Sequence, residues 1–330
     1  MKNLSSIAAL IASALVSAAP APALAADITE SYPTKPISLI VPFPPGGPTD
    51  ALARRLAQGL SEPLGQPVIV ENKSGAGGNI GSEYVAKSKP DGYTILFGTS
   101  GPLAINVSLY KRLGYDPRRS FSPIIRIGHL PNILVVNSSL PVKNLEELIA
   151  YARANPNKLS FASSGNGASS HLAGVLFNQM AGTNIQHIPY RGTGPALNDL
   201  LGAQVSMSFT DILTALPHIK SGALRPIGLA SAERSSALPE LPTLSEQGLE
   251  GYDVSVFFGI VAPEGTPAPI VDKLNKAFRT TMQVPEIKQT LAHQGIVEAT
   301  DQTPEGLKTF IGKEVPKWAE LVKNANIALD

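Results

Sequence analysis

The sequence predicts an α/β fold with mostly parallel sheets flanked by helices and divided into two lobes. Three observations lead to this prediction. Short runs rich in β-branched residues alternate with helical patterns along most of the chain, as they do in βαβ units. Loops rich in glycine, proline and serine follow several of these runs. The chain of 330 residues is long enough for two domains, yet it contains no low-complexity linker.

The predicted strands are short apolar runs bounded by turn residues. The first, residues 37–41, reads ISLIV and leads into a loop of prolines and glycines. Further strands are expected at residues 68–71, 94–98, 133–136, 159–162, 184–189, 205–209 and 225–229. No helix or strand is predicted for the proline-containing segment 120–131.

Helical patterns lie between these strands and dominate the C-terminal part. Helices are expected at residues 49–60, 82–87, 145–155, 170–180 and 195–201. Apolar residues recur on one helical face from Ile270 to Met282 and again from Leu307 to Val322. Pro316 is expected to kink the second of these helices.

The absence of a linker predicts that the chain crosses between the lobes at a hinge. The crossovers are placed near residues 124–128 and 228–231. Lobe 1 is therefore predicted to be discontinuous, with residues 26–127 and 229–330, and lobe 2 to comprise residues 128–228.

Composition excludes several classes of function. The formal net charge is +1, which provides no electrostatic basis for binding nucleic acid or an anionic membrane. The chain has no cysteine, which excludes disulfides, thiolate zinc sites, iron–sulfur clusters, a thiol nucleophile and a lipid-modified N-terminal cysteine.

The N-terminus has the pattern of a cleavable secretory signal peptide over residues 1–25. Lys2 is followed by an uncharged apolar run from Leu4 to Val16, and an A-x-A site ends at Ala25, after which cleavage is expected. The run is shorter than the ~20 residues of a membrane-spanning helix. These features predict a soluble protein exported to a bacterial periplasm.

The strongest local feature is the segment VPFPPGGPTD, which runs from Val41 to Asp50 between a strand and a helix. Gly46 and Gly47 let the backbone approach a ligand closely, and Thr49 or Asp50 can cap the helix. Free N–H groups at a helix N-terminus form an anion site. The alternative is a turn that simply requires glycine and proline.

A second segment, FASSGNGASSHLAG, has the same strand, loop and helix order. Its loop holds only small residues and one asparagine, more than a plain capped turn requires, and this favours an anion or polar ligand. Hydroxyls and bare amides are supplied by Ser163, Ser164, Gly165, Gly167, Ser169 and Ser170. His171 is expected to orient the loop or lie at the surface rather than act as a base.

Three weaker loops repeat this theme at residues 75–81, 99–101 and 190–194. Loops at the carboxyl ends of strands share one edge of an open α/β sheet, where ligands bind. Asp211 follows the strand 205–209 and is expected at the same edge, either as a ligand contact or as the N-cap of a helix starting at Ile212.

Enzyme motifs are mostly absent. The chain contains no dinucleotide fingerprint, P-loop, G-x-S-x-G or H-E-x-x-H motif, and its five histidines are not spaced as metal ligands. No cofactor, metal or catalytic residue is therefore expected. The alternative is a hydrolase with Ser169 or Ser170 as nucleophile and His171 as base, because such pairs are defined by geometry.

The free energy needed for ligand binding favours a cleft that closes. One helix N-terminus contributes up to ~2 kcal/mol, whereas micromolar affinity needs about 8 kcal/mol. Several hydrogen bonds made in a closing, water-excluding cleft must supply the rest.

Several blocks together resemble the Bug family, the periplasmic solute receptors of tripartite tricarboxylate transporters. These blocks are YPTKPI at residues 32–37, VPFPPGGPTD, ENKSGAGGNIG at residues 71–81, PDGYT at residues 90–94 and HIPYRG at residues 187–192. The resemblance covers essentially the whole chain after residue 25. It implies a two-lobed periplasmic binding protein of type II topology that holds a carboxylate between its lobes, in part through ordered water.

The resemblance also implies the ligand contacts and the ligand class. Matched by motif, the contacts are Phe43, Pro44, Gly46, Gly47, Asp50, Thr99, Ser100, Ser163, Ser164, Gly167, Ala168, Ser169, Tyr190 and Asp211. Pro102 and Leu103 stand where many members carry a polar residue, which favours an aromatic or aliphatic acid.

The implied function is a monomeric receptor, not an enzyme, that captures a small mono- or dicarboxylate by lobe closure. It would deliver this ligand to the integral-membrane permease subunits of the transporter. Besides the hydrolase, the alternative is a ligand sensor for a signalling partner.

Overall fold

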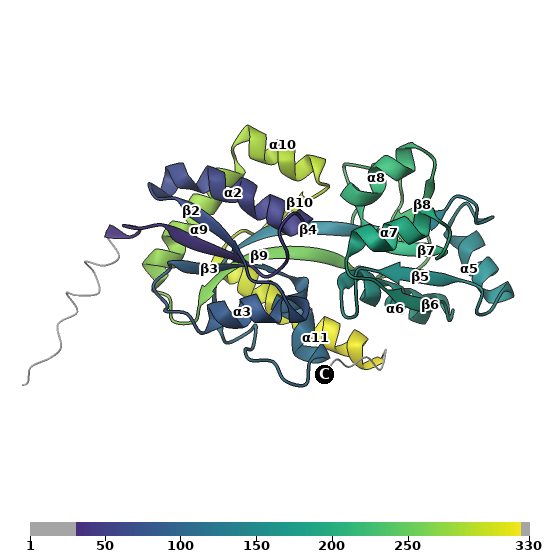
Figure 1. The fold of residues 1–330 in the computed structure, drawn as a ribbon, viewed down its shortest axis with the longest axis horizontal. Coiled ribbons are helices and arrows are strands. Elements are labelled where there is room, and N and C mark those ends of the chain that lie inside the picture. Colours follow the sequence, from purple (N-terminus) through teal and green to yellow (C-terminus); the bar gives the residue numbers. More distant parts are fainter. Residues whose placement is uncertain (1–30, 325–330) are drawn as a thin grey trace, which may run out of the picture. The chain divides into compact units, whose positions relative to one another are not determined.

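The computed structural model describes residues 31–324 (Figure 1). The predicted signal peptide and its cleavage site lie outside these residues. Within them, every helix is too short or too polar to traverse a lipid bilayer.

The described strands form one mixed sheet in the order β2-β1-β3-β9-β4-β7-β5-β6, and β8 and β10 also pair with β4. Their bounds are β1 Ile37–Val41, β2 Val68–Asn72, β3 Thr94–Thr99, β4 Phe121–Asn137, β5 Ser160–Ser163, β6 Gln186–Pro189, β7 Met207–Asp211, β8 Leu224–Leu229, β9 Ser255–Pro263 and β10 Val297–Glu298.

Strand β4 joins the two halves of this sheet. Its first part pairs with β9 as far as Pro131, and its second part, from Asn132, pairs with β7 and β8. Figure 1 shows β4 and β9 running side by side from one half to the other. The fold is thus two-lobed, with the lobes connected through a continuous strand rather than through a flexible linker.

The parallel pairings expected from the sequence occur on both sides of this connection. Strand β1 is parallel to β2 and β3, and β5 is parallel to β6 and β7. The central strands differ, because β4 and β9 run antiparallel to each other and to their other neighbours. The sheet is therefore mixed rather than uniformly parallel.

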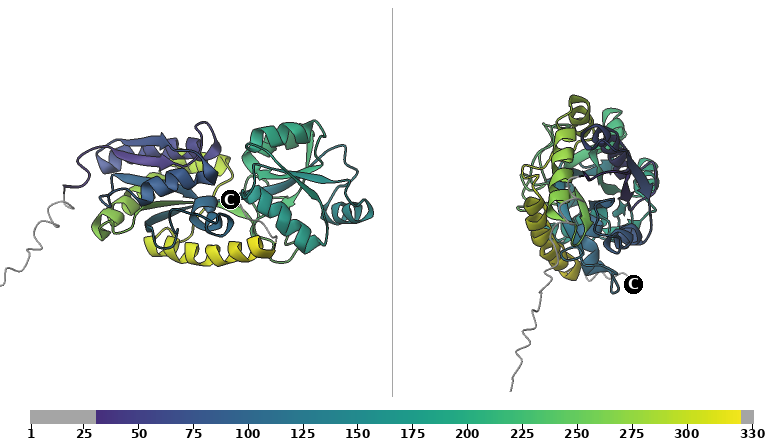
Figure 2. Two further views of the ribbon diagram at one scale, coloured as in Figure 1. Left: turned by 60° about the horizontal axis from the view of Figure 1, so that its bottom comes forward. Right: turned by 90° about the vertical axis from the view of Figure 1, so that its left-hand side faces the viewer.

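Helices cover both faces of each half. Their bounds are α2 Pro48–Leu64, α3 Asn79–Ala86, α4 Asn106–Leu109, α5 Leu145–Ala154, α6 Ser169–Ala181, α7 Thr193–Leu201, α8 Ile212–Lys220, α9 Ala268–Met282, α10 Pro285–His293 and α11 Pro304–Asn324, with short turns η1 Ala76–Gly78 and η2 Gly101–Ile105. Figure 1 shows α2 and α10 above β1 to β3, with α3 and α11 below them. The long α11, yellow in Figure 2, packs against β4, η2 and α6.

Buried apolar side chains explain why these elements pack. Alternate positions of β4 bury Leu134 and Val136 in one cluster and Ile133 and Val135 in another, on opposite faces of the sheet. The apolar face of α11 includes Trp318, whose Nε1 donates to the Glu314 carboxylate at 2.8 Å.

Most predicted elements have the predicted type, but segment 120–131 is different. It forms the first part of β4, although prolines disfavour strand interiors. The ladder with β9 shifts register between Pro123 and Ile125, so Pro123 lies at an irregularity where the regular hydrogen-bond pattern is interrupted. Strands β9 and β10 and helix α10 were not expected, and α11 continues through Pro316.

Gly128 lies directly opposite Glu298 in the ladder between β4 and β10. A Cβ at this position would lie 2.2 Å from the Val297 carbonyl oxygen and 3.1 Å from the Glu298 Cα, and backbone atoms cannot move aside cheaply. We expect Gly128→Ala to lower the free energy of unfolding by about 1–3 kcal/mol, as overpacking does. Urea denaturation measures this change.

Gly312, in α11, provides the matched control. No atom lies within 4 Å of a Cβ built there. Alanine is favoured over glycine in helices by about 1 kcal/mol, so Gly312→Ala is expected to stabilise the protein. Equal urea midpoints for Gly128→Ala and the wild type would contradict the packing described for β10.

Candidate ligand-binding site

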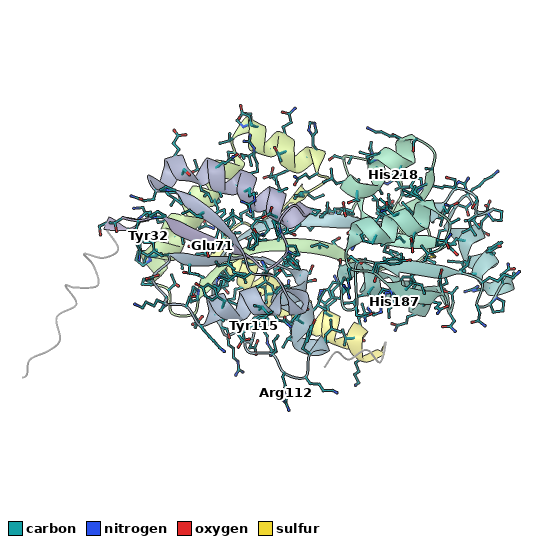
Figure 3. The ribbon with its side chains drawn as sticks, viewed as in Figure 1. Tyr32, Glu71, Arg112, Tyr115, His187 and His218 are labelled. Atoms are coloured by element: carbon teal, nitrogen blue, oxygen red, sulfur yellow. The ribbon has the colours of Figure 1, made fainter. Side chains whose placement is uncertain are left out.

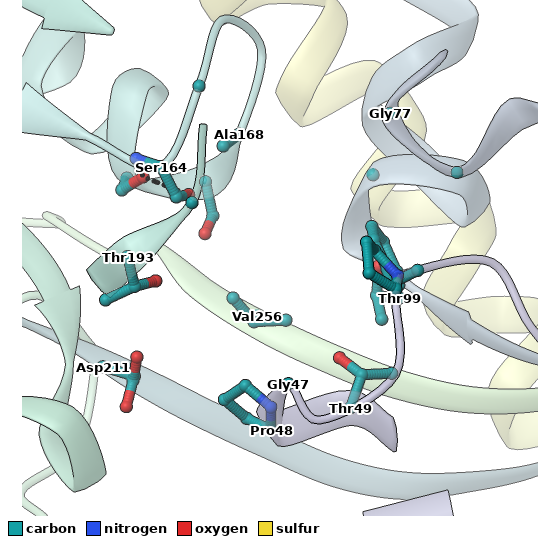
Figure 4. A pocket seen from close by; sticks show the side chains of 18 of the residues that line it. Gly47, Pro48, Thr49, Gly77, Thr99, Ser164, Ala168, Thr193, Asp211 and Val256 are labelled. Carbon is teal, nitrogen blue, oxygen red and sulfur yellow. Dashed lines mark hydrogen bonds between the residues drawn. The ribbon is translucent and has the colours of Figure 1, made fainter. Parts of the chain in front are cut away.

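A cleft of about 1250 Å³ lies between the two halves of the molecule. Loops after β1, β2 and β3 line one side, and loops after β5, β6 and β7 line the other. Figure 4 shows Gly47, Thr49 and Thr99 on one side, with Ser164 and Asp211 opposite. The cleft thus lies at the carboxyl ends of the parallel strands, as expected.

All but two of the residues predicted to contact ligand line this cleft. They are Phe43, Pro44, Gly46, Gly47, Asp50, Thr99, Ser100, Ser164, Gly167, Ala168, Ser169 and Asp211. The sequence motifs therefore identify residues that are far apart in the chain and that the fold brings together.

Ser163 and Tyr190 are the two predicted contacts that do not line the cleft. Ser163 is fully buried, and its Oγ lies 2.6 Å from His187 Nε2. The Tyr190 hydroxyl donates to Asp199 Oδ2 at 2.6 Å, and burial together with Asp199 raises the pKa of Tyr190 to about 12. Both side chains are thus engaged by partners in their own lobe, and they support the loops from behind.

The loop after β1 is held by Asp50, which is 4% exposed. Its Oδ2 accepts hydrogen bonds from the Gly46 N–H and from Arg54 Nε, both at 2.9 Å. Its Oδ1 accepts from Asn72 Nδ2 at 2.8 Å, and Asn72 also donates to the Phe43 carbonyl oxygen. Asp50 therefore fixes the shape of this loop, with its oxygens already occupied by protein donors.

The loop after β5 is held in a similar way, by side chains of α6. The Ser164 N–H donates to Ser170 Oγ at 3.0 Å, and the Gly167 N–H donates to His171 Nδ1 at 3.1 Å. Gly165 and Gly167 have φ of +140° and +77°, where glycine is favoured. These contacts present the start of α6 to the cleft.

Three helices begin at the cleft without a side-chain cap. The N-caps of α2, α6 and α7 are Gly47, Ala168 and Gly192, and none makes a capping hydrogen bond through its side chain. The first N–H groups of a helix have no partner within the helix. Pro48, the first residue of α2, has no N–H, so the donors of α2 begin at Thr49. Together with the first N–H groups of α6 and α7, they can donate hydrogen bonds to an anion in the cleft.

Known proteins show the same sequence pattern and fold. The family model described as "Tripartite tricarboxylate transporter family receptor" matches residues 52–327. Protein BugT of Bordetella pertussis is 38% identical over 99% of each chain.

The chain belongs to the family of tripartite tricarboxylate transporter receptors.

Solved structures agree with this assignment. The periplasmic binding protein BugD is 41% identical, with a TM-score of 0.80 over 90% of this chain and 99% of that one. The structure of Rpa4515 from R. palustris with adipate is 38% identical, with a TM-score of 0.82 over 90% of this chain and 99% of the other. This receptor thus has the fold and family of periplasmic solute-binding proteins.

Two histidines lie behind the second loop of the receptor. The rings of His171 and His187 stack with centroids 3.8 Å apart and planes 12° from parallel, and Figure 3 labels His187 beside α6. Burial lowers the pKa of each to about 4, and for His171 the neighbouring His187 adds to the effect. Both rings are neutral at pH 7, and His171 orients the loop, as expected.

The serine–histidine pair of the hydrolase alternative is not formed in the described part of the receptor. Ser170 Oγ lies 2.9 Å from Ser164 Oγ and accepts its N–H, and neither Ser169 nor Ser170 has a hydrogen bond to His171. The serine that does meet a histidine, Ser163, is buried away from the cleft.

The sequence motifs do not identify the residues at the floor of the cleft. Leu130 and Asn132 reach it from β4, and Val256 and Phe258 reach it from β9. Residues of buried strands carry no local motif, so only the pairing of β4 with β9 reveals them. The described residues contain no group of three or more histidine, aspartate or glutamate side chains suited to a metal.

Replacing Asp50 by alanine is expected to destabilise the receptor. Burial disfavours its charge, but hydrogen bonds from Arg54, Gly46 and Asn72 outweigh that effect and lower its pKa from 3.8 to about 2. A pKa lowered on folding contributes stability above pH 3.8, which is lost as the pH falls towards 2. The shift corresponds to about 2 kcal/mol at neutral pH, measurable by urea denaturation.

The control for Asp50→Ala is Asp301→Ala, which removes an exposed carboxylate remote from the cleft. Since Asp301 accepts hydrogen bonds from Thr303 only, its replacement is expected to cost less and to leave ligand affinity unchanged. An Asp50→Ala variant as stable as the wild type would show that the network around this carboxylate does not hold the loop.

Proposed function

We propose that this receptor captures a small organic carboxylate in the cleft by lobe closure and delivers it to the permease subunits of a tripartite tricarboxylate transporter. Binding without chemical change is the proposed activity. The predicted contacts that line the cleft are proposed to form the site, with Ser163 and Tyr190 acting from behind.

The observation that carries this proposal is the convergence of three uncapped helix N-termini on one cleft. Thr49 in α2, Ser169 in α6 and Thr193 in α7 stand in the first turn of their helices, and all three line the cleft. Their donors suit an anion with several acceptor oxygens. Each helix end contributes up to ~2 kcal/mol, so closure onto both faces of the ligand is needed for micromolar affinity.

Fixed neutral donors, rather than a salt bridge, are proposed to hold the carboxylate. Among the described residues that line the cleft, the charged ones are Asp50, Arg191 and Asp211. Arg191 is exposed in the loop between β6 and α7, and Asp50 is already paired with Arg54. The structure of the related Rpa4515 with adipate supports a carboxylate as the class of ligand.

We also propose a cellular location, an oligomeric state and lobe boundaries for this receptor. We place the mature chain in the periplasm, after cleavage behind Ala25, as a monomer with lobes of residues 26–127 plus 229–330 and 128–228. The division of β4 between two sets of partner strands at Pro131 and Asn132 supports lobe boundaries in this region.

A thermal-shift screen of the mature protein tests the proposal. The panel contains mono-, di- and tricarboxylates, amino acids, sugars and inorganic phosphate, and any hit is recovered and analysed by mass spectrometry. A ligand at 100 times its Kd is expected to stabilise by about 2.7 kcal/mol. Shifts confined to carboxylates, recovered unchanged, are the expected result. A shift only with sugars or phosphate, or turnover of an ester substrate, would contradict it.

A further inference from the structure

One carboxylate in the cleft has an oxygen without a partner. Asp211 ends β7 and caps α8, where its Oδ1 accepts from the Thr214 N–H at 2.8 Å and from Thr214 Oγ1 at 2.5 Å. Within residues 31–324, Asp211 forms no ion pair and its Oδ2 accepts no hydrogen bond. A carboxylate has about four lone-pair sites, so one oxygen of Asp211 remains available to a ligand.

The surroundings of Asp211 differ from those of Asp50, the other acid on the cleft. Asp50 has three donors, including an arginine, whereas Asp211 has only Thr214 and the N-terminus of α8. A helix N-terminus carries about half an elementary positive charge, which offsets part of one negative charge. Asp211 therefore contributes net negative potential to the cleft, whereas the backbone N–H groups at the helix N-termini favour an anion.

Two further polar residues, Asn132 and Thr210, line the same wall of the cleft. Asn132 lies directly opposite Asp211 in the β4–β7 ladder and is 3% exposed. Thr210 is 4% exposed, and its Oγ1 has no hydrogen-bond partner in the described structure. Figure 4 shows Asp211 on the same side of the cleft as Thr193 and Ser164, across from Pro48. A ligand that reaches from the α2 loop to this wall meets the Asp211 acceptor together with two groups that can donate or accept, the Asn132 amide and the Thr210 hydroxyl.

These observations restrict the ligand. A second carboxylate of the ligand placed beside Asp211 would be repelled by its like charge. An ammonium or hydroxyl group on the ligand would instead donate to the open oxygen, and the hydrogen bond is stronger when the donor is charged.

We infer that Asp211 selects carboxylates that also carry a hydrogen-bond donor near the second lobe, with an ammonium preferred over a hydroxyl. The inference rests on the proposed function, since it assumes that a carboxylate binds at the helix N-termini. Asp211 thus acts on specificity. It contributes little to the binding of the carboxylate group, and it distinguishes ligands by the substituent that they carry.

Two series of acids that differ only at C2 test this inference by isothermal titration calorimetry. One is succinate, malate and aspartate, and the other is adipate, 2-hydroxyadipate and 2-aminoadipate. In the series whose length fits the cleft, the amino acid is expected to bind at least 10-fold more tightly than the unsubstituted acid, with the hydroxy acid between them.

Asp211→Asn is the decisive variant, because asparagine caps helices as well as aspartate does. Its Oδ1 can keep the bond from the Thr214 N–H, while its amide then presents a donor where the carboxylate oxygen stood. The preference for the amino acid is expected to disappear, and the unsubstituted acid is expected to bind more tightly than it does to the wild type. A urea titration confirms that the variant is folded.

Thr214→Val separates capping from charge. It removes the shorter of the two bonds to Asp211 but keeps the carboxylate, so the ligand preference is expected to survive. Equal affinities for all three members of a series, or a preference unchanged in Asp211→Asn, overturn the inference and leave the proposed function intact. Binding of none of the six acids also overturns the inference, whereas the proposed function is overturned only when no carboxylate of the thermal-shift panel binds.

Discussion

Replacing Gly47 by tryptophan is expected to abolish ligand binding by the receptor while leaving its fold intact. Gly47 is the N-cap of α2, and its φ of −79° and ψ of 168° are open to any residue. The atom nearest to a Cβ built there is the Pro44 carbonyl oxygen, at 3.9 Å. The protein therefore has room for a side chain, but an indole would occupy the cleft at the start of α2.

We expect at least a 100-fold loss of affinity, or about 2.7 kcal/mol, measured by calorimetry with the best ligand from the thermal-shift screen. Gly47→Ala is the matched control. It adds only a Cβ and keeps the backbone N–H groups, so affinity within about 3-fold of wild type is expected. Undiminished binding by Gly47→Trp would exclude the α2 loop from the site.

Acid is expected to destabilise the receptor between pH 6.5 and pH 4 through His171 and His187. Each histidine has its folded pKa lowered to about 4 by burial, whereas the unfolded value is 6.5. The unfolded chain binds more protons in this interval, so stability is fully present above pH 6.5 and falls as the pH approaches 4. His171 accounts for about 2 kcal/mol at pH 5, and the more exposed His187 for less.

Urea denaturation at pH 7.5 and pH 5.0 measures this loss. A variant with both histidines replaced by glutamine is the control, because glutamine can donate and accept hydrogen bonds but does not titrate. Its stability is expected to be lower at pH 7.5 and to change much less between the two pH values. A wild type that is equally stable at both would show that the stacked pair takes up a proton without cost. Asp50 does not confuse the result, since its contribution is lost only below pH 3.8.

Local signals predicted the outer strands and their loops well. The run ISLIV is β1 with the predicted bounds, and helices predicted at residues 49–60 and 170–180 are α2 and α6 with slightly longer ranges. Strand β9 reads SVFFGIVAP, an apolar run that periodicity alone does not distinguish from a buried helix. The segment is a strand because it pairs with β3 and β4, which are distant in the sequence, and local patterns cannot predict such pairing.

The site shows the same division between local and distant information. Glycine and serine loops pointed to Gly47, Ser164 and Ala168 because a turn before a helix can be recognised from residue types. Residue types could not show that Tyr190 is captured by Asp199 or that Ser163 meets His187, since these partners depend on side-chain directions. The N-cap role of Asp211, left open against a ligand role, is confirmed by its bonds to Thr214.

The long β4 strand also determines the order in which the chain can fold. Its first part pairs with β9, and so does β3, so these two strands have a partner more than 120 positions later in the chain. The strands β5 to β8, by contrast, lie between these two segments, and the strands with which they pair lie within residues 132–229. Such distant pairing slows folding because the intervening loop must close first. The second lobe can therefore form its sheet first. The sheet of the first lobe is complete only after β9, in the last third of the chain, has been synthesised.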